Sequence, residues 1–294
     1  MRILKVSGLL LGLLATGSTA CTIGIQGQGV VSRDEKRLTL TGDPELTVRT
    51  YDGSIQVRSW DQKEVRVEIE RRGFDEKAAA ALVVNVTQNG NRIAIEAPSP
   101  AKSDGFFLGV SSSVSFIVTV PTRVTLEART GDGSIAVEDL TGSVTLNTGD
   151  GAVKVVRLAG SLKIHTGDGS IRVDEIAGKI DADTGDGSID LSGKLEAMTI
   201  RTGDGSVRVH VGDGSTLKSD WSITTGDGSI DVRLPKAIDA ELDAHTSDGS
   251  VRATGVDSME TNRRDDRHTV RARLGEGGRT LRVRTGDGSI VIAR

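Results

Sequence analysis

Aspartate recurs in this chain at a regular spacing, and nearly every copy stands between two glycines. The motif Thr-Gly-Asp-Gly-Ser-Ile, with close variants, recurs at intervals of 18 residues from Thr130 to Thr202, and further copies or variants begin at irregular intervals at Thr50, Thr225, Thr246 and Thr285. The repeated aspartates of the regular and C-terminal copies are Asp132, Asp150, Asp168, Asp186, Asp204, Asp227, Asp248 and Asp287. Carboxylates repeated at one interval supply the hard oxygen ligands that Ca²⁺ prefers.

Two explanations account for such a column of like charges, which repel by about 1 kcal/mol per pair at 4 Å in water. In the first, the aspartates serve the turn, because a carboxylate between glycines accepts hydrogen bonds from backbone N–H groups two residues on. In the second, the column binds Ca²⁺ between coils, as calcium-binding β-rolls do, although only one turn per coil carries the aspartate here. We favour turn chemistry and keep calcium as the alternative. The threonines that begin each motif follow the inward alternation, so we expect their hydroxyls to bond within the turn.

Short alternating runs of apolar and polar residues separate the motifs and must position them. Ile171-Arg172-Val173 is one such run, and the same apolar positions return in every repeat. A period of two residues indicates a strand with one buried face, and a short fixed repeat indicates a stacked protein. We therefore predict an all-β fold: a single-stranded β-solenoid, or β-helix, whose coils of about 18 residues each hold two strands, with aliphatic ladders inside and coils spaced about 4.8 Å apart.

The regularity is lower at both ends of the chain. Residues 28–127 are predicted to form a less regular, β-rich N-terminal capping region with one short helix over 75–82, and residues 128–294 the regular solenoid. Insertions are expected at 208–224 and 255–280. Within the second, the alternating segments 269–274 and 280–284 flank Gly275-Glu276-Gly277-Gly278, which predicts an extruded hairpin that helps to cover the open end.

Residues 1–20 have a basic start, an apolar run and a small-residue end, which is the layout of a secretory signal peptide. The only cysteine, Cys21, follows at once and resembles the lipidated first residue of a bacterial lipoprotein, with 21–27 as the tether. The sequence thus predicts an extracytoplasmic envelope protein that is anchored to a membrane through Cys21, with plain secretion as the alternative. Thr22 is not the aspartate that resembles an inner-membrane retention signal, which favours the outer membrane in a cell with two membranes.

Aromatic residues are scarce, at 2% of the chain, and most precede the regular repeats. Phe106 and Phe107 lie in a Pro/Gly/Ser-rich segment where exposed aromatics often anchor a partner, and Trp221 lies within an insertion. These three are the candidate contact residues for an envelope or extracellular polysaccharide or protein. Alternatively, the two phenylalanines cover the open end of the solenoid. With a net charge of −4 and no basic stripe, nucleic acid is not an expected partner.

The motifs of common catalytic sites are missing from the sequence. The four histidines are not placed with serine and aspartate in a way that suggests a triad, and no metal-ligand spacing is recognisable. We therefore predict a non-catalytic protein with no cofactor, Ca²⁺ being the exception named above. A polysaccharide-active enzyme is the third hypothesis, and Asp265 and Asp266 would be its candidate carboxylates.

The segment from Ser115 to Ile135, with an upstream echo from Leu46 to Val57, resembles the bacterial adhesin-like domains of the DUF4097 type. That resemblance covers most of the chain after the signal peptide. It implies an extracytoplasmic β-solenoid with a structural or adhesion role, and it brings no catalytic residues to this sequence.

Overall fold

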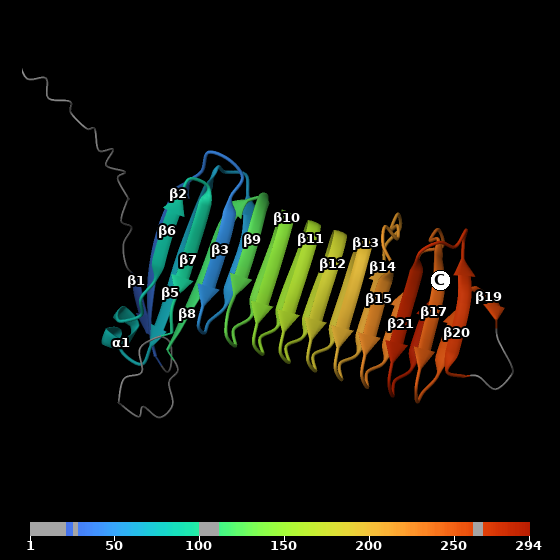
Figure 1. Cartoon of the computed structure of the whole chain (residues 1–294). Helices are drawn as coiled ribbons and strands as arrows, with labels where there is room; N and C mark the ends of the chain where they lie inside the picture. Colours follow the sequence, from blue (N-terminus) through green and yellow to red (C-terminus); the bar gives the residue numbers. More distant parts are fainter. Residues whose placement is uncertain (1–21, 26–28, 100–111, 261–266) are drawn as a thin grey trace, which may run out of the picture.

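A computed structural model describes residues 22–25, 29–99, 112–260 and 267–294, which form one elongated stack of β-strands with a short helix at one end (Figure 1). The fold is the predicted β-solenoid. Its inward side chains make two facing layers of aliphatic residues, and its outward side chains are polar and charged in every coil.

The elements of the N-terminal region are β1 (Thr22–Ile25), β2 (Val30–Thr39), β3 (Glu45–Thr50), β4 (Ile55–Trp60), β5 (Glu64–Gly73), α1 (Glu76–Ala80), β6 (Asn85–Asn89), β7 (Arg92–Ala97), β8 (Ser113–Pro121) and β9 (Arg123–Arg129). The regular coils are β10 (Ile135–Thr148), β11 (Val153–Thr166), β12 (Ile171–Thr184) and β13 (Ile189–Thr202). The C-terminal elements are β14 (Val207–Val211), β15 (Trp221–Thr225), β16 (Ile230–Arg233), β17 (Ala240–Thr246), β18 (Val251–Thr254), β19 (Asp257–Glu260), β20 (Thr269–Leu274), β21 (Thr280–Thr285) and β22 (Ile290–Ala293).

Each regular coil is one bent strand, which corrects the prediction of two separate strands per coil. β10 pairs in parallel with β11 from Ile135 to Glu138, skips Asp139, and continues from Leu140 to Thr148. Asp139 has a left-handed backbone, with φ of 61°. Gly142 also has a positive φ, of 136°, so the chain turns from one face of the solenoid to the other between Asp139 and Gly142, while the ladder to the next coil resumes at Leu140.

The core is a narrow layer between the two faces. In each regular coil the inward residues before the bend are buried, as Ile171 and Val173 are in β12, and so are those after it, as Ile180 and Ala182 are. Because the coils pair in register on both sides of the bend, the inward residues there stack on their equivalents in the next coil, as Ile171 does on Ile189 and Ile180 on Met198. Burial of such aliphatic ladders, at roughly 25 cal/mol per Å² of apolar surface, is the main stabilising term of the fold.

The N-terminal coils do not stack in the order of the sequence. β3 lies between β7 and β9, and β4 lies between β8 and β10, all in parallel pairs. The coil of residues 45–60, which carries the outlying motif at Thr50, is therefore inserted between the β7–β8 coil and the β9–β10 coil. The upstream copy that stood far from the others in sequence is thus adjacent to them in space.

The C-terminal coils are also stacked out of sequence order, and this arrangement corrects the prediction of an extruded hairpin. β20 and β21 do not pair with each other: β17 lies between them, antiparallel to β20 and parallel to β21. β21 also pairs with β15, and β22 lies between β16 and β18. The last coil of the chain is therefore inserted between two earlier coils, and β20 covers the edge of β17. The insertion predicted over 208–224 is narrower, because β14 and β15 both pair with β13.

Antiparallel strands and α1 close the N-terminal end of the stack. β8, β5, β2 and β1 form an antiparallel series on one face, and β7 and β6 pair on the other. The helix predicted over 75–82 is confirmed as α1, and its N-cap residue Asp75 accepts a hydrogen bond from the backbone N–H of Ala78 at 2.6 Å. Residues 22–25 form β1, so most of the segment predicted as a tether is instead part of the sheet.

Candidate functional site

The Gly-Asp-Gly turns lie along one edge of the solenoid, and threonine hydroxyls bind each turn to the preceding one. Thr166 is fully buried, and its Oγ1 lies 2.9 Å from the carbonyl oxygen of Gly149 and 3.2 Å from that of Gly151. Equivalent contacts recur at Thr148, Thr184, Thr202, Thr225, Thr285 and Thr246. The hydroxyls therefore donate to neighbouring coils, and the predicted bonds within the turn also occur: the N–H groups of Gly205 and Gly228 donate to Oγ1 of Thr202 and Thr225 at 3.3 Å.

Glycine is required in these turns by the closeness of the neighbouring coil. A Cβ atom added at Gly151 would lie 2.0 Å from the carbonyl oxygen of Gly133, and the same approach recurs along the column. Neither glycine has a positive φ. The motif therefore needs glycine because the backbones of successive turns are in contact, and the 18-residue spacing of these glycines corresponds to one coil of the stack.

The aspartate column lies on the solvent side of these turns. All eight side chains are exposed, and the strand order arranges them as Asp132, Asp150, Asp168, Asp186, Asp204, Asp227, Asp287 and Asp248. Within the described residues, no hydrogen bond or ion pair ends on any of these carboxylates. The predicted bonds from backbone N–H groups to the aspartate side chains are therefore wrong, and the turn is held by threonine and backbone groups instead.

The aspartate column is continuous because the coil of β21 and β22 is inserted between two earlier coils. The sequence separates Asp248 from Asp287 by the longest gap between motifs, but the turn of β21–β22 lies between those of β15–β16 and β17–β18. At a rise of about 4.8 Å per coil the carboxylates form a line of like charge that attracts cations. In the described part of the chain, no group of three or more His, Cys, Asp or Glu side chains is arranged to hold a metal ion.

Of the other predicted site residues, the structure describes only Trp221, and the prediction that it contacts a partner is wrong. Trp221 is fully buried and its Nε1–H donates to the carbonyl oxygen of Glu196 at 3.3 Å, so it belongs to the core and is not a contact residue. Its position at the start of β15, two residues before the inward Ile223, explains this burial. Cys21, Phe106, Phe107, Asp265 and Asp266 all lie outside the described residues.

A shallow groove on one face follows the column of serines that succeed the Gly-Asp-Gly motifs. It has a volume of about 430 Å³ and spans four successive coils. Its lining side chains include Ser188, Ser206, Ser229, Ser289, Asp190, Arg208, Asp231 and Val291. Arg208 donates to Asp190 at 2.6 Å, so part of its charge is paired. Sequence reasoning missed this groove because only the strand order brings Val291 beside Asp231.

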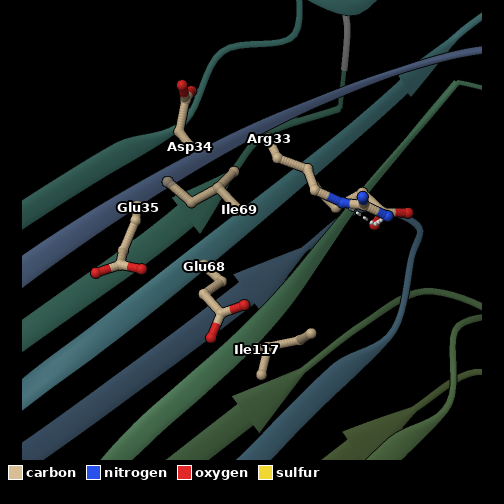
Figure 2. A pocket seen from close by; sticks show the side chains of 7 residues that line it. Arg33, Asp34, Glu35, Glu68, Ile69 and Ile117 are labelled. Carbon is tan, nitrogen blue, oxygen red and sulfur yellow. Dashed lines mark hydrogen bonds and ion pairs between the residues drawn. The ribbon is translucent and has the colours of Figure 1, made fainter. Parts of the chain in front are cut away.

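A second pocket, of about 210 Å³, lies over β2, β5 and β8 (Figure 2). Figure 2 shows Arg33 to one side of Glu68 and Ile117, which also line the pocket. The guanidinium of Arg33 donates to the Glu70 carboxylate at 3.0 and 3.1 Å. The pocket is open and its charges of opposite sign lie beside one another, which suits a polar surface contact better than the enclosure of a small molecule.

The opposite edge of the solenoid, at the bends, carries charges of both signs. Asp139, Arg157 and Glu175 occupy equivalent positions with φ of 61°, 54° and 61°. Arg157 donates to Asp139 through Nε at 2.5 Å and through Nη2 at 2.9 Å. This hydrogen-bonded pair holds the pKa of Asp139 below its ordinary value, mainly because the bond favours the charged carboxylate. The two edges therefore differ: one has paired charges and the other has unpaired carboxylates.

The strand order, the coil turns and the two flat faces define a class of protein, the β-solenoids built from short coils that stack in parallel. A family model described as Toastrack DUF4097 matches residues 44–293, and the chain belongs to this family. The family resemblance stated from the sequence is thereby confirmed. A search of curated proteins found no match.

Several solved structures are similar to this chain over nearly its whole length. A candidate lipid-binding protein from Parabacteroides distasonis has 15% identity and a TM-score of 0.49, covering 89% of this chain and 97% of that one. A candidate adhesin from the same organism has 13% identity and a TM-score of 0.43, covering 88% and 96%. One from Bacteroides fragilis has 11% identity and a TM-score of 0.37, covering 89% and 96%. Among the described residues, no helix is long and apolar enough to cross a membrane.

Proposed function

We propose that this protein is a lipid-anchored, extracytoplasmic and non-catalytic scaffold, whose rigid solenoid offers a repetitive surface for adhesion or structural work. The observation that supports it most is the in-register stacking of the coils. From β10 to β12 each paired outward position meets its equivalent in the next coil, and β13 continues this register on both sides of an irregular bend. Outward side chains therefore stand about 4.8 Å apart from coil to coil, and aspartate with serine recurs at the turns while the strand positions carry charges of both signs. Evenly spaced polar groups of this kind suit a polymer with its own repeat.

The binding part of the proposal is tested with the mature protein on an array of envelope and extracellular polysaccharides, with whole cells as a second target. Binding should weaken when outward residues of one face are changed and be unaffected by changes on the other. A matched pair for this test is Lys163→Ser and Lys154→Ser, which lie on opposite sides of the bend in β11 and are both exposed. Failure to bind any polymer or cell surface would leave only the structural role.

The anchoring part of the proposal is tested separately, by mass and by fractionation. The mature protein should carry the mass of a lipid on Cys21 and sediment with membranes. Cys21→Ser should release it into the soluble fraction. A mature N-terminus without lipid would show that the protein is simply secreted.

A calcium-dependent solenoid is the second candidate function, and the continuity of the aspartate column favours it. Unpaired carboxylates on successive coils would repel less when a cation lies between them. A ligand that binds only the folded protein raises the unfolding midpoint. Millimolar Ca²⁺ should therefore raise the melting temperature more than equal Mg²⁺ does, and Asp168→Asn should reduce that rise. Equal effects of the two ions would indicate charge screening alone.

A further inference from the structure

The N-terminal end of the solenoid carries an apolar surface beside the point where the anchor would join the fold. We will call Phe74 and Val83, which flank α1, the apolar rim. Phe74 is 44% exposed and Val83 is 58% exposed. Only one other large hydrophobic side chain of the described residues, Val291, is exposed. Two of these three residues therefore lie on one small cap, and a cap that served the core alone would not need apolar groups on its outer side.

The helix between them is held firmly against the end of the stack. α1 contacts β5 and β2, and it buries Ala79, with Leu82 buried just beyond it. A Cβ atom at Gly73 would lie 2.4 Å from the backbone nitrogen of Ala79, so the helix touches the last residue of β5. Figure 1 places α1 at the end of the stack where β1 and β5 also lie. The inner side of the cap is thus packed, and the rim is presented outward on a rigid support.

The anchor residue would enter the fold at the same end. Thr22, which follows Cys21 directly, is the first residue of β1 and pairs with Arg33 of β2. At the other end of β1, Ile25, Val30 and Gly73 form one row across three strands. With strands about 4.8 Å apart and about 3.4 Å per residue, Thr22 lies roughly 15 Å from the residue that precedes Phe74. No flexible tether separates a lipid on Cys21 from this end of the solenoid.

We infer that the apolar rim rests in the interface of a lipid bilayer, so that the solenoid stands with its N-terminal end against the membrane. The inference rests on the proposed lipidation of Cys21. A lipid held that close keeps the end of the stack at the headgroup level, where exposed apolar side chains gain by leaving water. The solenoid axis then points away from the membrane, and the end formed by β18 and β19 is the most distant part.

A spin label on the rim tests this inference, because the lipid would occupy the chain's only cysteine. Val83→Cys and Val291→Cys are matched variants, since both replace an exposed valine. Each full-length protein is purified from membranes, labelled with a nitroxide and reconstituted in phosphatidylcholine–phosphatidylglycerol vesicles. We expect the label at residue 83 to be more accessible to oxygen than to a water-soluble nickel chelate, and the label at residue 291 to show the reverse.

Two results would overturn the inference, and they can be told apart. If the protein carries the lipid mass but the label at residue 83 is as accessible to the nickel chelate as that at residue 291, anchoring is right and the seated end is wrong. If the lipid mass is missing and the label remains in water when vesicles are added, anchoring and the seated end both fail. Protection of the label at residue 83 in the detergent-free Cys21→Ser protein, without vesicles, would assign the rim to a second copy of the chain instead.

Discussion

Substituting valine for Thr225 isolates the contribution of the buried threonine column. Thr225 is 3% exposed, and its Oγ1 lies 3.0 Å from the carbonyl oxygen of Gly203 and 2.9 Å from that of Gly205. It also accepts a hydrogen bond from the N–H of Gly228 at 3.3 Å. Thr225→Val keeps the shape of the side chain and removes every one of these contacts.

The expected loss follows from the number of bonds. The hydroxyl proton serves one carbonyl at a time, so the substitution removes one donated and one accepted bond at about 1 kcal/mol each. Backbone groups left without partners add to this, while the new methyl group recovers part of it. We expect the free energy of unfolding to fall by about 2–3 kcal/mol in total. At about 2–4 °C per kcal/mol for a chain of this size, the melting temperature should fall by roughly 4–12 °C.

The neighbouring Thr224 is the matched control, because it lies on the same strand and is exposed. Thr224→Val should change stability by less than about 0.5 kcal/mol. Both variants are compared by urea denaturation of the mature protein, using the midpoint at unchanged slope. Equal stability of the two variants would refute the conclusion that the hydroxyl column holds the coils together.

Three further substitutions test other features of the coils. Gly151→Ala should destabilise the protein by several kcal/mol in the same denaturation assay, because its Cβ would lie 2.0 Å from a carbonyl oxygen, whereas Ala152→Ser should have little effect. Glu175→Gly should stabilise the protein by about 0.5–1 kcal/mol, because the left-handed backbone strain that glycine relieves, about 1–2 kcal/mol, exceeds the extra chain entropy that glycine loses on folding. A destabilised variant would contradict this. Arg157→Gln should raise the pKa of Asp139 toward its ordinary value in an NMR titration. Because the folded pKa of Asp139 is lowered, its pairing stabilises the protein above the ordinary pKa of aspartate, and this contribution is lost as pH falls through the folded pKa; an unchanged titration would show that the ion pair does not form in solution.

The regular coils could be predicted because two periods in the sequence agree. The alternation of Ile171, Val173 and their neighbours fixes which side chains point inward, and the 18-residue spacing fixes which residues stack. The position of the bend can also be predicted, because Gly142 and its equivalents lie in it with φ near 136°. The predicted break between two strands is wrong because the ladder skips only Asp139 and resumes at Leu140.

The order of the end coils could not be predicted from the same signals. Every coil carries nearly the same turn, so the motif at Thr285 fits equally well beside several others, and only long-range strand pairing places it between β15–β16 and β17–β18. Trp221 is a different kind of error. The alternation of Trp221 with Ile223 and Thr225 indicates an inward side chain, whereas the irregular spacing of the surrounding segment suggests an exposed insertion, and the alternation is the signal that the structure follows.

The position of the last coil sets a condition on how the chain can mature. A ribosome delivers residues 280–294 after both of the coils that flank them, and yet these residues occupy the place between those coils in the stack. Until they arrive, β15 and β17 each lack their β21 partner, so the C-terminal half cannot be completed by adding coils in the order of synthesis. A nascent or prematurely terminated chain would keep two mutually unsatisfied strand edges. Pairing of β15 and β17 thereby depends on residues 280–294, and a chain without them would leave strand edges exposed to proteases and chaperones.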